Sequence, residues 1–199
     1  MLTVTTPATG TPAGTEYDLI TVATARAALG IVDQADDATL QGFVSRASGV
    51  IASYCNRVFA VETVTETFRL DRLQEDLLLS RYPVIAVTSI VENGNALTVN
   101  TDYEVDAAKG IITRLYNDRA AWWPMCKVTI VYSAGYETKP GNLQQACVEL
   151  VKSYYLSADR DPMVRSEATE AIGSTSYYSE TLPPNVLGLL GQFRNIRMR

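Results

Sequence analysis

The sequence of 199 residues contains no histidine. This absence excludes Ser-His-Asp and Cys-His nucleophiles, histidine general bases and histidine metal ligands. The three cysteines, Cys55, Cys126 and Cys147, lie far apart and show no CxxC spacing. Disulfide frameworks and zinc sites need numerous or clustered cysteines, so we expect three reduced, mostly buried thiols in a reducing compartment.

Long apolar runs and signature motifs are also missing. No apolar run reaches about 18 residues, the length of a membrane span. The first fifteen residues lack the charged and apolar segments of a secretory signal. Dinucleotide-binding, P-loop, nucleophile-elbow and metalloprotease motifs are absent as well. We therefore expect no cofactor, no resident metal and no membrane partner.

The residues that are present predict a folded chain. Hydrophobic residues make up 47% of the sequence and charged residues 20%, close to the averages for globular proteins. This length suits one domain, or one domain with a small inserted subdomain. The net charge of −5 argues against tight sequence-independent binding to DNA, which needs many phosphate-neutralising lysines and arginines.

Three segments have the apolar spacing of three and four residues that is typical of amphipathic helices. They cover residues 21–29, 36–57 and 142–157. Thr21 is the expected cap of the first helix, and an acidic cluster ending at Asp36 and Asp37 is expected to cap the second. Asn142 and Gln145 fit a capping box at the start of the third.

Between residues 61 and 133 the apolar period changes to that of β-strands. We expect five or six short strands, one of them over residues 96–105, in an antiparallel sheet, because the connections are too short for parallel crossovers. The Asn93-Gly94 pair between two apolar runs predicts a hairpin. Adjacent strand residues face opposite sides, so we expect one of Trp122 and Trp123 in the core and the other at a neighbour.

The remaining segments are the two ends and one long connection. Residues 1–16 are rich in Thr, Pro and Gly and predict a flexible arm, and residues 158–181 predict a long polar loop that carries the exposed pair Tyr177-Tyr178. Residues 182–199 predict a short apolar helix with a basic tail. The expected fold is α+β: a helical bundle with an inserted antiparallel β subdomain, a C-terminal helix and an extended tail.

Two other functions remain open from the residues alone. A carboxylate-based glycan hydrolase needs two carboxylates about 5 to 9.5 Å apart in one cleft. The candidate pairs are Glu62 with Glu66, Asp71 with Glu75, and Glu104 with Asp106, all of which we expect to be solvated surface charges. The second alternative is a monomeric module that binds a peptide or glycan through its β face.

Several stretches, taken together from Tyr17 to Arg194, resemble one known family. They are Leu19-Ile20-Thr21, Ala28-Leu29-Gly30-Ile31, Asp36-Asp37-Ala38-Thr39-Leu40, Tyr54-Cys55-Asn56-Arg57-Val58-Phe59, Tyr82-Pro83-Val84, Val87-Thr88-Ser89-Ile90, Gly94, Tyr103, Tyr132-Ser133-Ala134-Gly135-Tyr136, Pro140, Leu182-Pro183-Pro184, Leu190 and Arg194. The pattern resembles the head–tail connector proteins, also called adaptor or head-completion proteins, of tailed double-stranded DNA phages and gene transfer agents.

This resemblance implies a structural protein of the virion neck without enzymatic activity, assembled in the bacterial host cytoplasm. It implies a ring, usually of twelve copies, that lies under the portal protein and docks a stopper or tail-completion protein. Double-stranded DNA would pass through the lumen without specific binding. The implied portal-binding residues are Leu187, Leu190, Phe193, Arg194, Arg197 and Arg199. The expected contacts between copies or with partners are Trp122, Trp123, Tyr177 and Tyr178.

Overall fold

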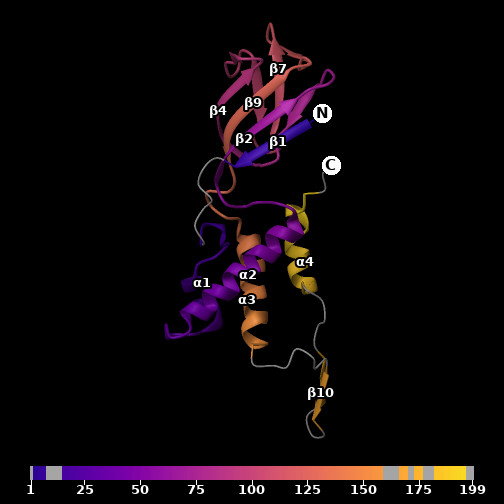
Figure 1. The fold of residues 1–199 in the computed structure, drawn as a ribbon. Coiled ribbons are helices and arrows are strands. Elements are labelled where there is room, and N and C mark those ends of the chain that lie inside the picture. Colours follow the sequence, from indigo (N-terminus) through magenta and orange to yellow (C-terminus); the bar gives the residue numbers. More distant parts are fainter. Residues whose placement is uncertain (1, 8–14, 159–165, 170–172, 177–181, 196–199) are drawn as a thin grey trace. The chain divides into compact units, whose positions relative to one another are not determined.

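The computed structural model describes residues 2–7, 15–158, 166–169, 173–176 and 182–195. These residues form α-helices and antiparallel sheets, which confirms the predicted α+β class. The chain divides into two compact units (Figure 1). The helical unit comprises Tyr17–Arg57 and Lys139–Arg199, and the β unit comprises Met1–Glu16 and Val58–Thr138.

The helical unit is assembled on α2 (Asp37–Cys55). α1 (Val22–Leu29) and α3 (Gly141–Leu156) pack against α2, and α4 (Pro184–Leu190), which continues as a 3-10 turn over Gly191–Phe193, packs against α3. The buried side chains of these helices include Ala25, Leu40, Val44, Ala47, Ile51, Cys55, Leu143, Ala146, Cys147, Leu150, Val151, Val186, Leu190 and Phe193. Their spacing confirms the predicted apolar faces of α2 and α3.

Two of the predicted helix starts differ in how they are stabilised. Thr21 caps α1 as predicted, because its Oγ1 accepts a hydrogen bond from the Thr24 amide at 3.2 Å. Asp36 occupies the N-cap position of α2, but its side chain makes no capping hydrogen bond. Asp37 instead forms an ion pair with Arg26 of α1 at 3.0 Å. The acidic cluster therefore ties two helices together rather than capping one.

The capping box predicted for α3 is wrong. The helix begins at Gly141, one residue earlier than expected, and Pro140 is its N-cap. The Pro140 carbonyl accepts the first amide hydrogen bonds of the helix, so Asn142 already lies inside the first turn. The Gln145 side chain donates to Glu149 at 2.7 Å, one turn further along the helix.

The β unit contains two antiparallel sheets. The first has the strand order β1 (Leu2–Pro7), β2 (Glu62–Arg69), β9 (Lys127–Ala134), β4 (Val84–Glu92) and β5 (Asn95–Ala96). The second has the order β3 (Asp76–Leu78), β7 (Ile111–Tyr116) and β6 (Tyr103–Asp106), and β8 (Arg119–Ala121) also pairs with β7. Every strand ladder in the described ranges is antiparallel, as predicted.

Turn residues explain one confirmed prediction and one wrong one. Asn93 and Gly94 join β4 to β5 with φ values of 47° and 89°, as a two-residue hairpin requires. The single strand predicted over residues 96–105 is interrupted, because the chain turns after Ala96. The Thr98 amide there donates to the Asp102 carboxylate at 2.8 Å, a local hydrogen bond that competes with strand pairing.

Two segments predicted to be irregular contain strands. Residues 2–7 of the predicted flexible arm form β1, which pairs with β2 along its whole length. Within the predicted loop of residues 158–181, β10 (Ser166–Thr169) and β11 (Gly173–Ser176) form an antiparallel hairpin. Both predictions rested on the scarcity of apolar side chains, whereas a strand ladder needs only backbone amides and carbonyls.

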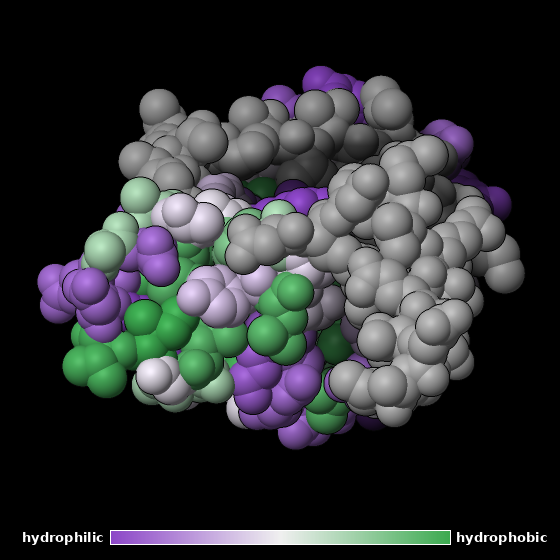
Figure 2. Space-filling view, turned by 90° about the horizontal axis from the view of Figure 1, so that it is seen from below, coloured by the Kyte–Doolittle hydropathy of each residue, from purple (hydrophilic) through white to green (hydrophobic). Residues whose placement is uncertain are grey.

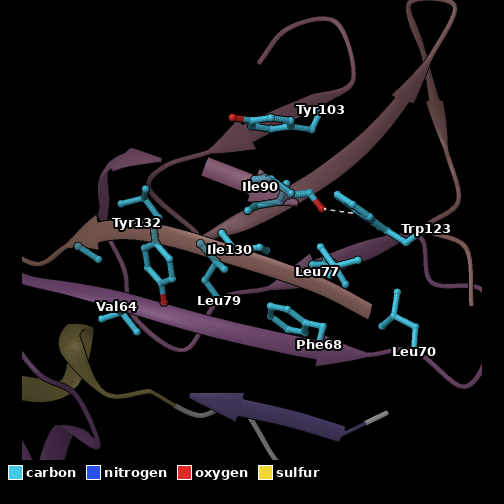
Figure 3. Close-up of a cluster of buried hydrophobic side chains, with 14 residues drawn as sticks. Val64, Phe68, Leu70, Leu77, Leu79, Ile90, Tyr103, Trp123, Ile130 and Tyr132 are labelled. Atoms are coloured by element: carbon cyan, nitrogen blue, oxygen red, sulfur yellow. Dashed lines mark hydrogen bonds between the residues drawn. The ribbon is translucent and has the colours of Figure 1, made fainter. Parts of the chain in front are cut away.

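Aromatic and branched side chains fill the core of the β unit. Phe68, Ile90, Ile130 and Tyr132 are fully buried, and Trp123 lies among them at the end of the cluster (Figure 3). The Trp123 indole N–H donates to the Ile112 carbonyl at 3.2 Å, which satisfies its one polar group. The expectation that one of the two tryptophans enters the core is confirmed.

A buried carboxyl group connects the two strands β2 and β9 to the segment after β3. Glu66 is fully buried and accepts hydrogen bonds from the Ser80 amide at 2.9 Å, the Ser80 hydroxyl and the Tyr132 hydroxyl at 2.7 Å. The prediction of a solvated charge is therefore wrong for Glu66. Its strand alternation with Val64 and Phe68 places it on the inward face of β2.

We predict that Tyr132→Phe lowers the free energy of unfolding by about 1 to 3 kcal/mol, since it removes a donor to this buried carboxyl group. Urea denaturation of the full chain measures the change. Tyr116→Phe is the control, because Tyr116 is 70% exposed and its substitution should change stability by no more than about 0.5 kcal/mol. Equal urea midpoints for the two variants would contradict the assigned role of Tyr132.

Buried thiols predict a loss of stability in alkaline solution. Burial raises the pKa of Cys55 and of Cys147 from 9.0 to about 11. In the unfolded chain these thiols lose their protons at lower pH than in the folded chain. The free energy of unfolding is therefore highest below pH 9.0 and falls as the pH rises to about 11, by roughly 2 to 3 kcal/mol for each thiol. Unfolding in urea at about pH 8 and about pH 11 should show a smaller decline for Cys147→Ala. An unchanged decline would show that Cys147 is not the titrating group.

Candidate interface surfaces

A groove of about 540 Å³ lies along the solvent side of α2 in the helical unit. We call it the α2 groove; it is lined by Ser45, Arg46, Gly49, Val50, Ser53, Tyr54 and Leu182. Short side chains on successive turns of the helix leave it hollow. Seen from below, the molecule exposes hydrophobic residues next to strongly hydrophilic ones (Figure 2).

The glycines of α2 are not required by packing inside the chain. Gly42 and Gly49 are exposed, and a Cβ atom added at either would meet no other atom of the described residues within 4 Å. A glycine in a helix interior costs about 1 kcal/mol relative to alanine. The chain therefore carries a less stable helix whose exposed face is open at Gly49. The sequence indicates this open face of α2, because the outward positions of residues 36–57 carry few charged side chains.

Two arginines lie at the α2 groove: Arg46 is one of its lining residues, and Arg194 packs on the lining residue Tyr54. The Arg46 guanidinium lies 4.6 Å from the centre of the Tyr154 ring, and that of Arg194 lies 5.6 Å from the centre of the Tyr54 ring. In the part of the chain that the structure describes, neither guanidinium forms an ion pair with a carboxylate. The groove is therefore positively charged at these residues. Burial raises the pKa of Tyr154, and the charge of Arg46 opposes that rise.

Two of the six expected portal-binding residues are buried in the single chain. Leu190 and Phe193 are buried within the helical unit, where the C-terminal helix packs against α3. They are therefore not available on the surface, because the apolar face of α4 is used inside the chain itself. Leu187 is half-buried, and Arg194 is exposed. Arg197 and Arg199 lie outside the described residues.

The two tryptophans have opposite environments. Trp123, one of the expected contact residues, is fully buried, whereas Trp122 is 59% exposed. Backbone hydrogen bonds between Gln74 and Trp123 place Leu73 and Trp122 on the outward side of this bridge, and Leu73 and the nearby Met125 are also exposed. Trp122 therefore belongs to an exposed apolar surface of the β unit. Tyr177 and Tyr178 lie outside the described residues.

The candidate carboxylates are ion-paired, buried or exposed to solvent, and Asp71, Glu75 and Glu104 are among the exposed ones. Glu62 is paired with Arg81 at 3.3 Å, and Glu66 is fully buried under its three donors. Asp106 is paired with Lys109 at 2.9 Å on the surface. The described residues contain no group of three or more side chains suited to a metal ion. Among the helices that the structure describes, none combines the length and apolar character needed to cross a bilayer.

Structures of similar fold come from gene transfer agent particles. The chain of the neck of an empty particle, computed with C6 symmetry, has a TM-score of 0.62 and 19% identity. That of the native neck, computed with C12 symmetry, has a TM-score of 0.63 and 20% identity. A chain of the native virion has a TM-score of 0.61 and 21% identity. Each match covers 98% of this chain and 97% of the other.

The curated proteins contain no significant match to this sequence. A family model described as head completion protein matches residues 18–196, which is most of the chain. Proteins of this kind are structural parts of the connection between phage head and tail, and they are not enzymes. This match agrees with the resemblance in sequence and with the shared fold. The chain belongs to the head completion protein family.

Proposed function

We propose that this protein assembles as a ring under the portal of a DNA-filled head and joins it to a stopper or tail-completion protein. The single observation that carries the proposal is the family match over residues 18–196. The fold supports it, because similar chains form necks computed with C6 and C12 symmetry. The architecture suited to this role is a helical bundle with an inserted β subdomain.

A ring of about twelve copies needs an interface between two different faces of neighbouring subunits. Our candidates for these faces are the α2 groove and the exposed apolar surface around Trp122. Twelve copies at a net charge of −5 carry about −60 in total. Acidic residues facing the lumen would repel the DNA backbone, which suits a channel that lets double-stranded DNA pass without binding it.

The C-terminal segment is our candidate for the portal contact. Leu187 and Arg194 provide its accessible part, and Arg197 and Arg199 extend the positive charge of the tail. We place the assembled ring in the virion neck and its assembly in the bacterial host cytoplasm. A monomeric module that binds a peptide or glycan is the alternative, and the loss-of-function experiment below separates the two.

Deletion of the gene in the producing strain should yield DNA-packaged heads without tails, some of which have lost their DNA. Negative-stain electron microscopy and measurement of nuclease-resistant DNA in the particles are the readouts. Complementation with the wild-type gene is the control. Normal tailed particles in the deletion strain would contradict the connector function and favour the binding-module alternative.

We predict that Trp122→Ser lowers the yield of tailed particles at least about tenfold, because large aromatic side chains dominate the binding energy of interfaces. The yield is counted by electron microscopy of particles from the variant strain. Tyr116→Ser is the matched control, since Tyr116 is an aromatic residue of the same unit with 70% exposure. Equal yields from the two variants would remove Trp122 from the contact surface.

A further inference from the structure

The loop between α1 and α2 is complementary to the α2 groove in shape and in charge. This loop covers residues 31–36, and its Val32 side chain is 93% exposed, which is unusual for an aliphatic residue next to a helix end. Exposed carboxylates follow at Asp33 and Asp36. An apolar side chain flanked by two negative charges is thus presented on the same unit as an apolar hollow with two positive charges.

Local hydrogen bonds hold this loop in one conformation. The Asp33 carboxylate accepts the Gln34 amide at 2.6 Å and the Ala35 amide at 3.2 Å. Gly30 ends α1 with a left-handed backbone, and the ion pair of Arg26 with Asp37 joins the helices on either side of the loop. The conformation that exposes Val32 is therefore already formed before any partner binds, which lowers the entropy cost of docking.

The loop cannot reach the α2 groove of its own chain. The loop ends where α2 begins, at Asp37, and the groove is centred on Gly49 of the same helix. An α-helix rises 1.5 Å per residue, so these two points are about 18 Å apart along a rigid rod. A Val32 side chain that fills a groove of this kind must belong to another copy.

We propose that Val32 of one copy docks in the α2 groove of the next copy, with Asp33 and Asp36 facing Arg46 and Arg194. The contact joins two different faces, so its repetition closes a ring when the rotation between copies is suitable. Burial of Val32 supplies apolar binding energy, and the opposite charges set orientation and partner choice. The open space at Gly49 admits the loop. This contact rests on the ring of the proposed function.

A cysteine pair tests the contact in the full-length protein. Val32→Cys and Gly49→Cys are introduced together, and purified particles are oxidised and run on a denaturing gel. A disulfide needs Cα atoms about 4.4 to 6.8 Å apart, so only copies in the proposed contact can be joined. We expect a ladder of covalent oligomers beyond the dimer. Val32→Cys with Gly42→Cys is the matched control and should give no ladder, because Gly42 lies on α2 outside the groove lining.

The outcomes separate this contact from the proposed function. Particles that contain the variant protein but give no ladder overturn the contact and leave the connector function standing. If the variant and wild-type proteins are both absent from particles, the connector function fails. The same oxidation of the purified full chain at high concentration then decides the contact: a ladder supports it, and monomers alone overturn it.

A second pair of variants separates assembly from folding. Gly49→Leu fills the α2 groove and replaces a helix-destabilising residue, so the urea midpoint should not fall while the yield of tailed particles drops at least about tenfold. Gly42→Leu makes the same change on an exposed turn and should leave the yield within about twofold. Equal yields from the two variants would overturn the proposal.

The charges are tested by reversal. Arg46→Glu should lower the yield of tailed particles, because it places a negative charge opposite the carboxylates of the neighbouring loop. Addition of Asp36→Arg in the same chain should restore the yield at least partly. Each contact then pairs a positive charge at position 36 of one copy with a negative charge at position 46 of the next. Failure of the second substitution to restore any yield would remove this charge pair from the contact.

Discussion

Burial of one face of α2 is the interaction on which the helical unit depends. Leu40, Val44 and Ile51 are fully buried, and each such side chain contributes about 1.5 to 3 kcal/mol relative to an exposed one. Both α1 and α3 pack against this helix, and α4 packs against α3. Because the apolar residues fix which side of α2 faces inward, they also fix which side faces outward. The position of the α2 groove therefore follows from the core packing.

The β unit is organised around a polar group rather than around apolar contacts alone. The Glu66 carboxyl group receives three hydrogen bonds from Ser80 and Tyr132, and its neighbour Glu62 is paired with Arg81. A buried carboxyl group with these donors fixes one register between the strands and the segment after β3, since a shift would leave it without partners. The outward residues, such as Trp122, are presented from this fixed frame.

The periodic spacing of apolar residues predicted most of the helices and strands. The wrong predictions concerned single residues and strands that pair through their backbones. Spacing predicted α2 and α3, and Asn93-Gly94 predicted its hairpin. β1 and the β10–β11 hairpin were missed because their ladders use backbone groups, which leave little trace in side-chain patterns. Phe193 shows a related limit: a sequence reveals that a face is apolar, but it does not reveal whether the face packs within the chain or against another protein.

Both units are built from chain segments that are far apart in the sequence. β1 pairs with β2, which is synthesised more than fifty residues later, and α2 packs against α3, which follows after more than eighty residues. During translation α1 is the only packing partner of α2 among the described helices until the ribosome has passed Leu156, and the core is completed only with Phe193. A chain that ends before α3 lacks the buried side chains that α3 and α4 contribute to the helical unit. Packing of the helical unit is therefore a late event of translation, because α3 and α4 must both be synthesised before the apolar face of α2 and the core around Phe193 are covered.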